Sequence, residues 1–193
     1  GTVETAKTSI PELSRMMVGR DIQFKVDKKP AQPGEVVLEV ENLTVVSPYS
    51  QKNVVNDVSF KVRKGEIVCL AGIEGNGQSE IIYAISGMMK AASGRIVLNG
   101  EDITHRNIRY RNDHGISHVP EDRQKYGLIL DYNLAYNLAL KQYHLPRFQK
   151  LGFLKKDAIK AYAEQLSGQY DIRAGQGGAT IARSMSGGNQ QKA

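Results

Sequence analysis

The stretch GIEGNGQSE, Gly72 to Glu80, lies between the apolar run EIVCLAG and a segment with helical apolar spacing, SEIIYAISGMM. Its spacing fits the phosphate-loop pattern G-x-x-x-x-G-K-[ST], with glycine at 72 and 77 and serine at 79. The lysine position of that pattern holds Gln78, whose amide donates a hydrogen bond but carries no charge. On its own, the stretch predicts either a phosphate-binding loop or a tight turn between a strand and a helix.

The flanks of this loop supply the context that a phosphate site needs. The run at 66–72 is apolar nearly throughout, which predicts a strand buried on both faces, with Cys69 as a small core residue. Glycines let backbone N–H groups approach phosphates closely, and the following helix directs the positive end of its dipole at them. The hydroxyl of Ser79 is then in position to ligate Mg²⁺.

Composition indicates a globular protein of a reducing compartment. The chain has 193 residues, of which 40% are hydrophobic, and 26 Lys and Arg stand against 20 Asp and Glu. The net charge of +6 either steers anions and acidic partners or is simply a basic surface. A single cysteine excludes an internal disulfide, the apolar runs are too short to cross a bilayer, and no signal peptide opens the chain. We therefore expect a cytoplasmic protein. No basic stripe is interleaved with aromatic residues, so no nucleic acid partner is expected.

Away from the loop, strand patterns give way to helical ones. The sequence predicts a helix around 11–18 that ends at Gly19, and a charged, proline-containing linker at 24–35. Alternation predicts strands at 36–45 and 57–65, a hairpin turning at Asn99-Gly100 within 94–103, and a further buried strand at 115–123 that ends at Pro120. From Leu128 the spacing becomes helical, at 133–143 and again at 155–170.

A second glycine motif, SMSGGNQQKA at 184–193, decides between the two interpretations of the loop. Its composition alone fits a flexible linker, but the Gln-Gln-Lys-Ala that follows is good helix-forming material. Two glycines before a helix N-terminus make another anion site, with Ser186 as helix cap and phosphate-facing hydroxyl. The chain thus contains, in this order, a degenerate phosphate-loop pattern, a helical region and the second glycine motif, and this order is specific enough to favour a nucleotide-binding protein.

With both motifs in place, the sequence resembles the ATP-binding-cassette family. SMSGGNQQKA resembles the signature motif of these ATPases, GIEGNGQSE resembles their Walker A loop, and GISHVPEDRQKYGLIL resembles their Q-loop region, with Glu121 in place of glutamine. The pairing of P-E-D-R with G-G-N-Q-Q-K resembles the second cassette of tandem ATPases that drive importers of simple sugars and nucleosides. The segment at 125–143 favours the nucleoside branch, and residues 9–22 resemble the tail of the first cassette.

The resemblance implies an α/β fold, with a P-loop core, an antiparallel β-subdomain and an α-helical subdomain. No apolar strand ending in Asp-Glu follows Ser186, so we expect a cassette truncated at its C-terminus. The expected division is a tail and linker at 1–34, the P-loop core with the antiparallel β-subdomain at 35–127, and the helical subdomain at 128–193.

The resemblance also implies ATP and Mg²⁺ as ligands and two groups of site residues. The nucleotide-binding group consists of Tyr49, Gly72, Gly75, Asn76, Gly77, Gln78, Ser79, Glu80 and Glu121, with Ser79 also a metal ligand. The signature group, which would act on the nucleotide held by the other cassette, consists of Ser186, Gly187, Gly188, Asn189 and Gln190. Tyr49 either stacks on adenine or is a surface tyrosine, and Glu121 either lies near the γ-phosphate or is a surface carboxylate. No catalytic residue is expected within the chain, and we expect it to be inactive alone.

The expected partners are the first cassette and the membrane permease, which would hold the protein at the inner face of the membrane. The helical region at 128–172 should include the surface that docks the permease. Alternatives are a homodimer of this chain, a soluble cassette protein acting on ribosomes or nucleic acid, and a stand-alone P-loop kinase or GTPase, whose lysine is absent here. The transported solute is not specified by these residues.

Overall fold

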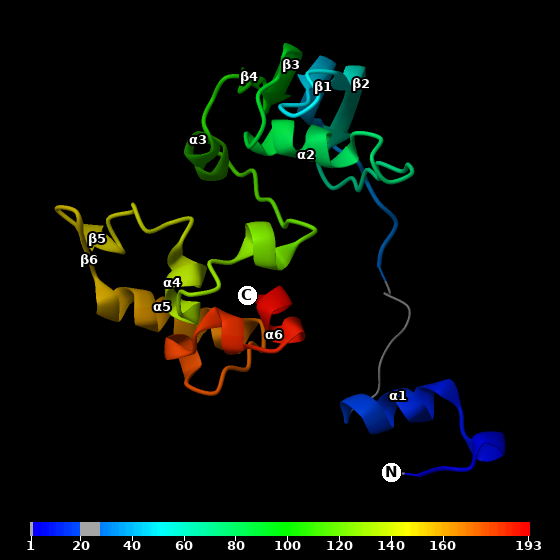
Figure 1. The fold of residues 1–193 in the computed structure, drawn as a ribbon, viewed down its shortest axis with the longest axis vertical. Coiled ribbons are helices and arrows are strands. Elements are labelled where there is room, and N and C mark those ends of the chain that lie inside the picture. The colour runs from blue at the N-terminus through cyan, green and yellow to red at the C-terminus, as the bar shows by residue number, and fades with distance from the viewer. Residues whose placement is uncertain (1, 20–27) are drawn as a thin grey trace.

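The structure, a computed structural model, describes residues 2–19 and 28–193. Figure 1 shows a sheet with one helix packed along it, a helical region beyond that helix, and an N-terminal helix set apart from both. The predicted linker falls partly on residues 24–27, which lie outside the described residues. No described helix is long and apolar enough to cross a membrane.

The sheet is antiparallel and has four strands in the order β2-β1-β3-β4. The strands are β1 (Val36–Val46), β2 (Asn53–Arg63), β3 (Ser93–Leu98) and β4 (Glu101–Asp102). Val40 of β1 pairs with Phe60 of β2 on one side and with Ile96 of β3 on the other. The strands predicted at 36–45 and 57–65 and the hairpin at Asn99-Gly100 are confirmed. The two turn residues have φ values of 49° and 83°, the positive values that such a turn requires.

Helix α2 (Gln78–Ser86) packs its buried face on this sheet. The shared core consists of Val40, Leu43, Val45, Val55, Ile81, Ala84, Ile96 and Ile103. Gly87 ends the helix, because this residue adopts a φ of 87° and donates its N–H to the carbonyl oxygen of Ala84. The helix that follows the glycine loop is therefore fixed by the sheet.

A buried arginine ties the far end of α2 to the next segment. Arg111, in α3 (Ile108–Asp113), is only 2% exposed and has no carboxylate partner among the described residues. Its guanidinium donates to the carbonyl oxygens of Ala84 and Ile85 at 2.8 and 2.7 Å, of Thr104 at 2.9 Å and of Arg106 at 3.0 Å. Burial lowers the pKa of Arg111. A cation at the C-terminal carbonyls of a helix is favoured by the helix dipole.

Two predicted buried strands are wrong. Residues 66–72 and 115–123 form no strand. Leu70 and Ile116 pack partly buried against the core, but Ile67 is 83% and Val119 86% exposed. Cys69, predicted as a core residue, is exposed. Among residues 2–19 and 28–193 no strand pairs with either segment, and an extended segment without neighbours can bury neither face.

The helical region follows a single π turn, η2 (Arg123–Gly127). Its main elements are α4 (Leu134–Ala139), the hairpin of β5 (Gln149–Lys150) and β6 (Phe153–Leu154), α5 (Lys156–Gln169), the 3₁₀ turns η3 (Gly177–Ala179) and η4 (Ala182–Ser184), and α6 (Gly187–Lys192). The predicted helices are confirmed, although α4 ends at Ala139. The β5–β6 hairpin was not predicted.

The predicted N-terminal helix is confirmed as α1 (Ile10–Val18), preceded by the 3₁₀ turn η1 (Thr5–Lys7). Ser9 caps α1 by accepting a hydrogen bond from the N–H of Glu12 at 3.4 Å, and Gly19 ends it with a φ of 77°. Ile10 and Met17 on this helix are 72% and 86% exposed.

Candidate functional site

The glycine loop has the backbone shape that its sequence predicts. Gly75 and Gly77 adopt φ values of 86° and 93°, a region that side-chain-bearing residues rarely enter. A Cβ added at Gly77 would lie 2.4 Å from the carbonyl oxygen of Val54 in β2, so only glycine fits there. The N–H of Asn76 donates to Ile73 at 3.3 Å, which closes the turn before α2 begins.

Gln78 turns its side chain back onto this loop. Its Nε2 donates to the carbonyl oxygen of Ile73 at 3.3 Å. A Cβ on Gly72 would lie 1.9 Å from the same Nε2, so the amide packs directly against the loop backbone. The position that holds a cation in the complete pattern is therefore filled by a neutral amide bound to the loop itself.

Ser79 and Glu121 meet beside the loop, although 42 residues separate them in sequence. The Ser79 hydroxyl lies 3.5 Å from each carboxylate oxygen of Glu121. Both line a cavity of about 300 Å³ together with Val68, Leu70, Gln78, Ile82, Tyr83, His118 and Val119. A hydroxyl and a carboxylate are oxygen ligands of the kind that Mg²⁺ prefers. Across the described residues, however, no group of three His, Cys, Asp or Glu side chains could hold a metal.

Two aromatic side chains of this cavity, Tyr83 and His118, are partly buried. Burial, followed by the nearby Tyr126 and Glu121, raises the pKa of the Tyr83 phenol. Burial, followed by the positive charge of Lys141, lowers the pKa of His118, which favours a neutral imidazole. The cavity therefore combines four aliphatic side chains with five that carry polar groups.

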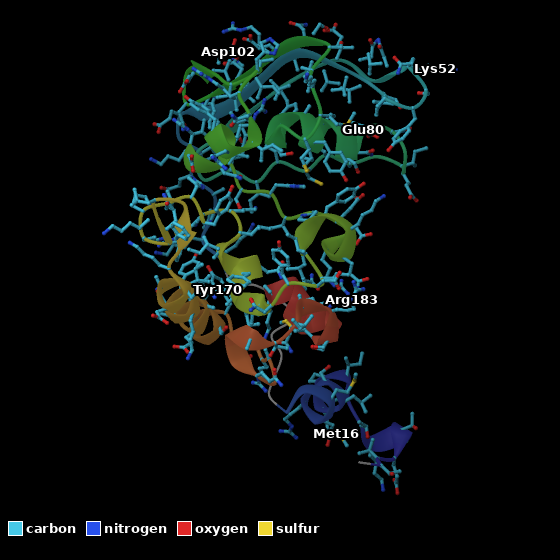
Figure 2. The ribbon with its side chains drawn as sticks, turned by 60° about the vertical axis from the view of Figure 1, so that its left-hand side comes forward. Met16, Lys52, Glu80, Asp102, Tyr170 and Arg183 are labelled. Atoms are coloured by element: carbon cyan, nitrogen blue, oxygen red, sulfur yellow. The ribbon has the colours of Figure 1, made fainter. Side chains whose placement is uncertain are left out.

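Two other predicted residues lie at the edge of this arrangement. Glu80 is half-buried on the first turn of α2, where Figure 2 labels it. Tyr49 is 96% exposed in the turn between β1 and β2 and contributes nothing to the cavity lining. Its predicted stacking on adenine stays a prediction.

The second motif forms a capped turn, as predicted. The Ser186 hydroxyl accepts hydrogen bonds from the N–H of Asn189 at 3.4 Å and from its Nδ2 at 2.9 Å. Gly187 and Gly188 are exposed, and a Cβ on Gly188 would meet nothing within 4 Å. Gln190 is instead buried, and its Nε2 donates to the carbonyl oxygen of Ala182 at 2.9 Å. Gln190 therefore supports the turn from inside, while residues 186–188 face outward.

The segment at 120–127 lies between the two motifs. The Asp122 carboxylate caps the π turn by accepting from the N–H groups of Gln124 and Lys125 at 2.9 and 3.0 Å. Gln124 then reaches the second motif, because its Nε2 lies 3.4 Å from Oε1 of Gln190. The sequence analysis selected only Glu121 from this segment, although P-E-D-R, which contributes to the family resemblance, was an available signal. No residue of the second motif lines the 300 Å³ cavity, so one copy of the chain does not combine the two motifs in one pocket.

The helical region carries a larger apolar groove of about 560 Å³. Its lining consists of Asp131, Tyr132, Asn133, Tyr136, Ala139, Leu140, Tyr143, Leu154, Ile159 and Ile181. Arg109 of α3 donates to the hydroxyl of Tyr143 at 2.9 Å, which fixes one wall of the groove to the sheet side of the molecule. The carboxylate of Asp131 forms an ion pair with Arg183, with 2.7 Å between Oδ1 and Nη2, so the charge of this lining residue is compensated.

The comparisons with known proteins agree on one family. The family model described as "ABC transporter" matches residues 55–193. The chain is 42% identical over 192 residues to the guanosine import ATP-binding protein NupO of Bacillus subtilis, and 43% identical to the nucleoside import ATP-binding protein NupA of Lactococcus lactis. Each match covers 100% of this chain but only 37% and 38% of the relative. The chain thus spans well under half the length of these relatives.

Solved structures match the fold. A nucleotide-free ATP-binding cassette from an ABC transporter superposes with a TM-score of 0.61 at 21% identity, over 81% of this chain and 61% of the other. An ATP-binding cassette in its ADP conformation gives a TM-score of 0.55 at 20% identity, over 82% and 63%. The predicted α/β fold, with a P-loop core, an antiparallel sheet and a helical region, is confirmed.

Proposed function

Because the chain belongs to the ABC transporter ATP-binding family, we propose that it is part of the ATP-binding subunit of an importer for nucleosides or simple sugars. The observation that carries the proposal is the arrangement of the two motifs. Ser79 and Glu121 meet beside the glycine loop, while the signature turn at 186–188 is exposed outside that cavity. Two motifs that lie apart in one copy suit a pair of cassettes. In such a pair, each nucleotide lies between the glycine loop of one cassette and the signature turn of the other.

In this proposal the glycine loop forms a weak nucleotide site. Gly72, Gly75, Asn76 and Gly77 supply the backbone around the phosphates, and Glu80 lies on the first turn of the helix behind them. The Ser79 hydroxyl and the Glu121 carboxylate would hold Mg²⁺, whose charge would offset that of the phosphates. The neutral Gln78 contributes no such charge, which makes the site weak. Tyr49 would reach the adenine only if its exposed turn moved onto the nucleotide.

The signature turn would act on ATP held by the partner cassette. The outward-facing Ser186, Gly187 and Gly188 would contact the γ-phosphate, with Asn189 orienting the Ser186 hydroxyl from a distance of 2.9 Å. Gln190 would keep the turn in place. The division into a tail and linker at 1–34, a core with its sheet at 35–127 and a helical subdomain at 128–193 belongs to the same proposal.

The 560 Å³ groove suits a membrane permease as its occupant. Three tyrosines and several aliphatic side chains line it, and an amphipathic helix would bury those surfaces. Docking there would place the protein at the inner face of the membrane.

Uptake and docking can be tested in a strain that expresses the whole importer. Loss of the gene should abolish uptake of labelled guanosine or of labelled ribose, and the solute whose uptake is lost identifies the branch. Tyr143→Glu, in the groove wall, should reduce copurification of the permease by about tenfold, the effect of losing one buried aromatic contact. Tyr170→Glu, on an exposed tyrosine outside the groove, is the matched control. Unchanged uptake of both solutes after gene loss would refute the proposal.

A further inference from the structure

Arg123 occupies an unusual position between the two motifs. It opens the π turn η2, and its Nε is buried without a hydrogen-bond partner among the described residues. Its guanidinium lies over Gly187: a Cβ built there would be 2.9 Å from Nη2 and 3.7 Å from Cζ of Arg123. A buried polar atom left unpaired carries a free-energy cost, so the placement of this side chain calls for a reason.

The π turn itself is held firmly on both sides. Asp122 caps it, and Gly127 packs against Pro120, whose Cγ would lie 3.2 Å from a Cβ at position 127. Short π turns inside or beside helices are frequent at functional sites. A rigid turn of this kind can present the Arg123 and Gln124 side chains in fixed directions toward α6.

We propose that Arg123 is a positioning residue for the signature turn, and that any side chain at position 187 would displace its guanidinium from that turn. Arg123 packs on the first glycine of the turn, and Gln124 reaches the buried Gln190 behind it. The turn at 186–190 is thereby held at two points by η2. The importance of that turn for ATP hydrolysis rests on the proposed function; its dependence on Arg123 does not.

The neighbouring glycine shows that the contact is specific. A Cβ at Gly188 would meet no atom within 4 Å, whereas one at Gly187 meets Arg123. Alanine favours helix over glycine by about 1 kcal/mol, so Gly188→Ala should leave amide exchange in α6 unchanged or slower. Gly187→Ala should do the opposite, because its methyl group displaces the guanidinium.

Amide hydrogen exchange in the chain tests the proposal directly. Arg123→Ala should speed exchange of the Asn189 and Gln190 amides, which bond to Ser186, by about tenfold, equivalent to ~1.4 kcal/mol of local opening. Exchange in α5 should not change. Gly187→Ala should speed exchange similarly, and the double variant should be no faster than either single variant, because both remove the same contact. Arg95→Ala, at an exposed arginine on β3, serves as the control.

Four outcomes are decisive. Unchanged exchange in Arg123→Ala, or effects that multiply in the double variant, would overturn the proposal. Arg123→Lys should restore little protection, since an ammonium lacks the planar face that packs on the glycine; full restoration would show that charge alone matters, which also contradicts the proposed packing. Faster exchange with unaltered ATP hydrolysis by the whole importer would support the positioning role and refute the proposed role of the signature turn in hydrolysis.

Discussion

Replacing Gln78 with lysine should turn the weak loop into a competent nucleotide site. The variant adds an ammonium that faces the phosphates, a charge-assisted contact worth about 1.5–3 kcal/mol. It also removes the hydrogen bond from Gln78 to Ile73, which contributes about 0.5–1.5 kcal/mol. Taking the middle of each range, the net gain is about 1.3 kcal/mol, which corresponds to Mg-ATP binding about eightfold tighter.

Titration calorimetry with Mg-ATP on both proteins measures this change. Gln78→Met is the matched control, because it removes the same hydrogen bond without adding charge, and its affinity should fall slightly or stay constant. Gln165→Lys adds the same charge on the exposed side of α5 and should have no effect. Raising the salt concentration should reduce the gain, since exposed charges are screened. If Gln78→Lys binds no better than Gln78→Met, the loop does not bind phosphates in the way that its shape indicates.

Four further outcomes are expected. The chain alone should release phosphate from ATP only at background rate in a phosphate-release assay, because phosphoryl transfer needs charge neutralisation that Gln78 does not provide. In the whole importer, Gly187→Asp should abolish ATP hydrolysis, because its side chain would displace the Arg123 guanidinium and disturb the signature turn. Gln78→Ala should leave most of the hydrolysis. Equal losses would contradict the proposal that the glycine loop of this chain forms only a weak nucleotide site. Arg111→Met should lower the free energy of unfolding, measured by urea titration, by at least ~3 kcal/mol, because four carbonyl oxygens lose their charged donor. A loss under ~1 kcal/mol would refute that reasoning. Hydrogen bonds from the Thr104 hydroxyl and N–H lower the pKa of Asp102 to about 2. The contribution of Asp102 to stability is therefore present above pH ~4 and is lost as the pH falls towards 2. Asp102→Asn should remove this part of the acid dependence, which unfolding measured at several pH values would reveal.

The sequence predicts elements whose signal is local. Strand alternation in β1 and β2, helical spacing in α2 and the Asn99-Gly100 turn all depend on neighbouring residues, and the structure confirms them. The β5–β6 hairpin escaped prediction because Leu151, with a φ of 51°, precedes Gly152 at its turn, where asparagine or aspartate is the usual signal.

Features that depend on distant partners were not predictable in this way. An apolar run such as 66–72 indicates that a segment suits burial, but it does not say which strands would cover it. Arg111 gave no sign of burial, because arginine is normally exposed and its acceptors are backbone carbonyls far along the chain. The contact of Arg123 with Gly187 likewise joins positions that no periodicity connects. At the candidate site, the sequence indicated Ser79, Glu121 and the Ser186 cap. It gave no indication of Arg123 and Gln124, which lie between the two motifs.

The tight fit of Gly77 against Val54 has an evolutionary consequence. The glycine is required by the carbonyl oxygen of a neighbouring strand, whether or not a phosphate ever enters the loop. Selection on nucleotide affinity can therefore relax at position 78 while packing continues to forbid any change at position 77. Glycine at position 77 therefore reports on the packing of the fold, and not on whether the loop binds a nucleotide.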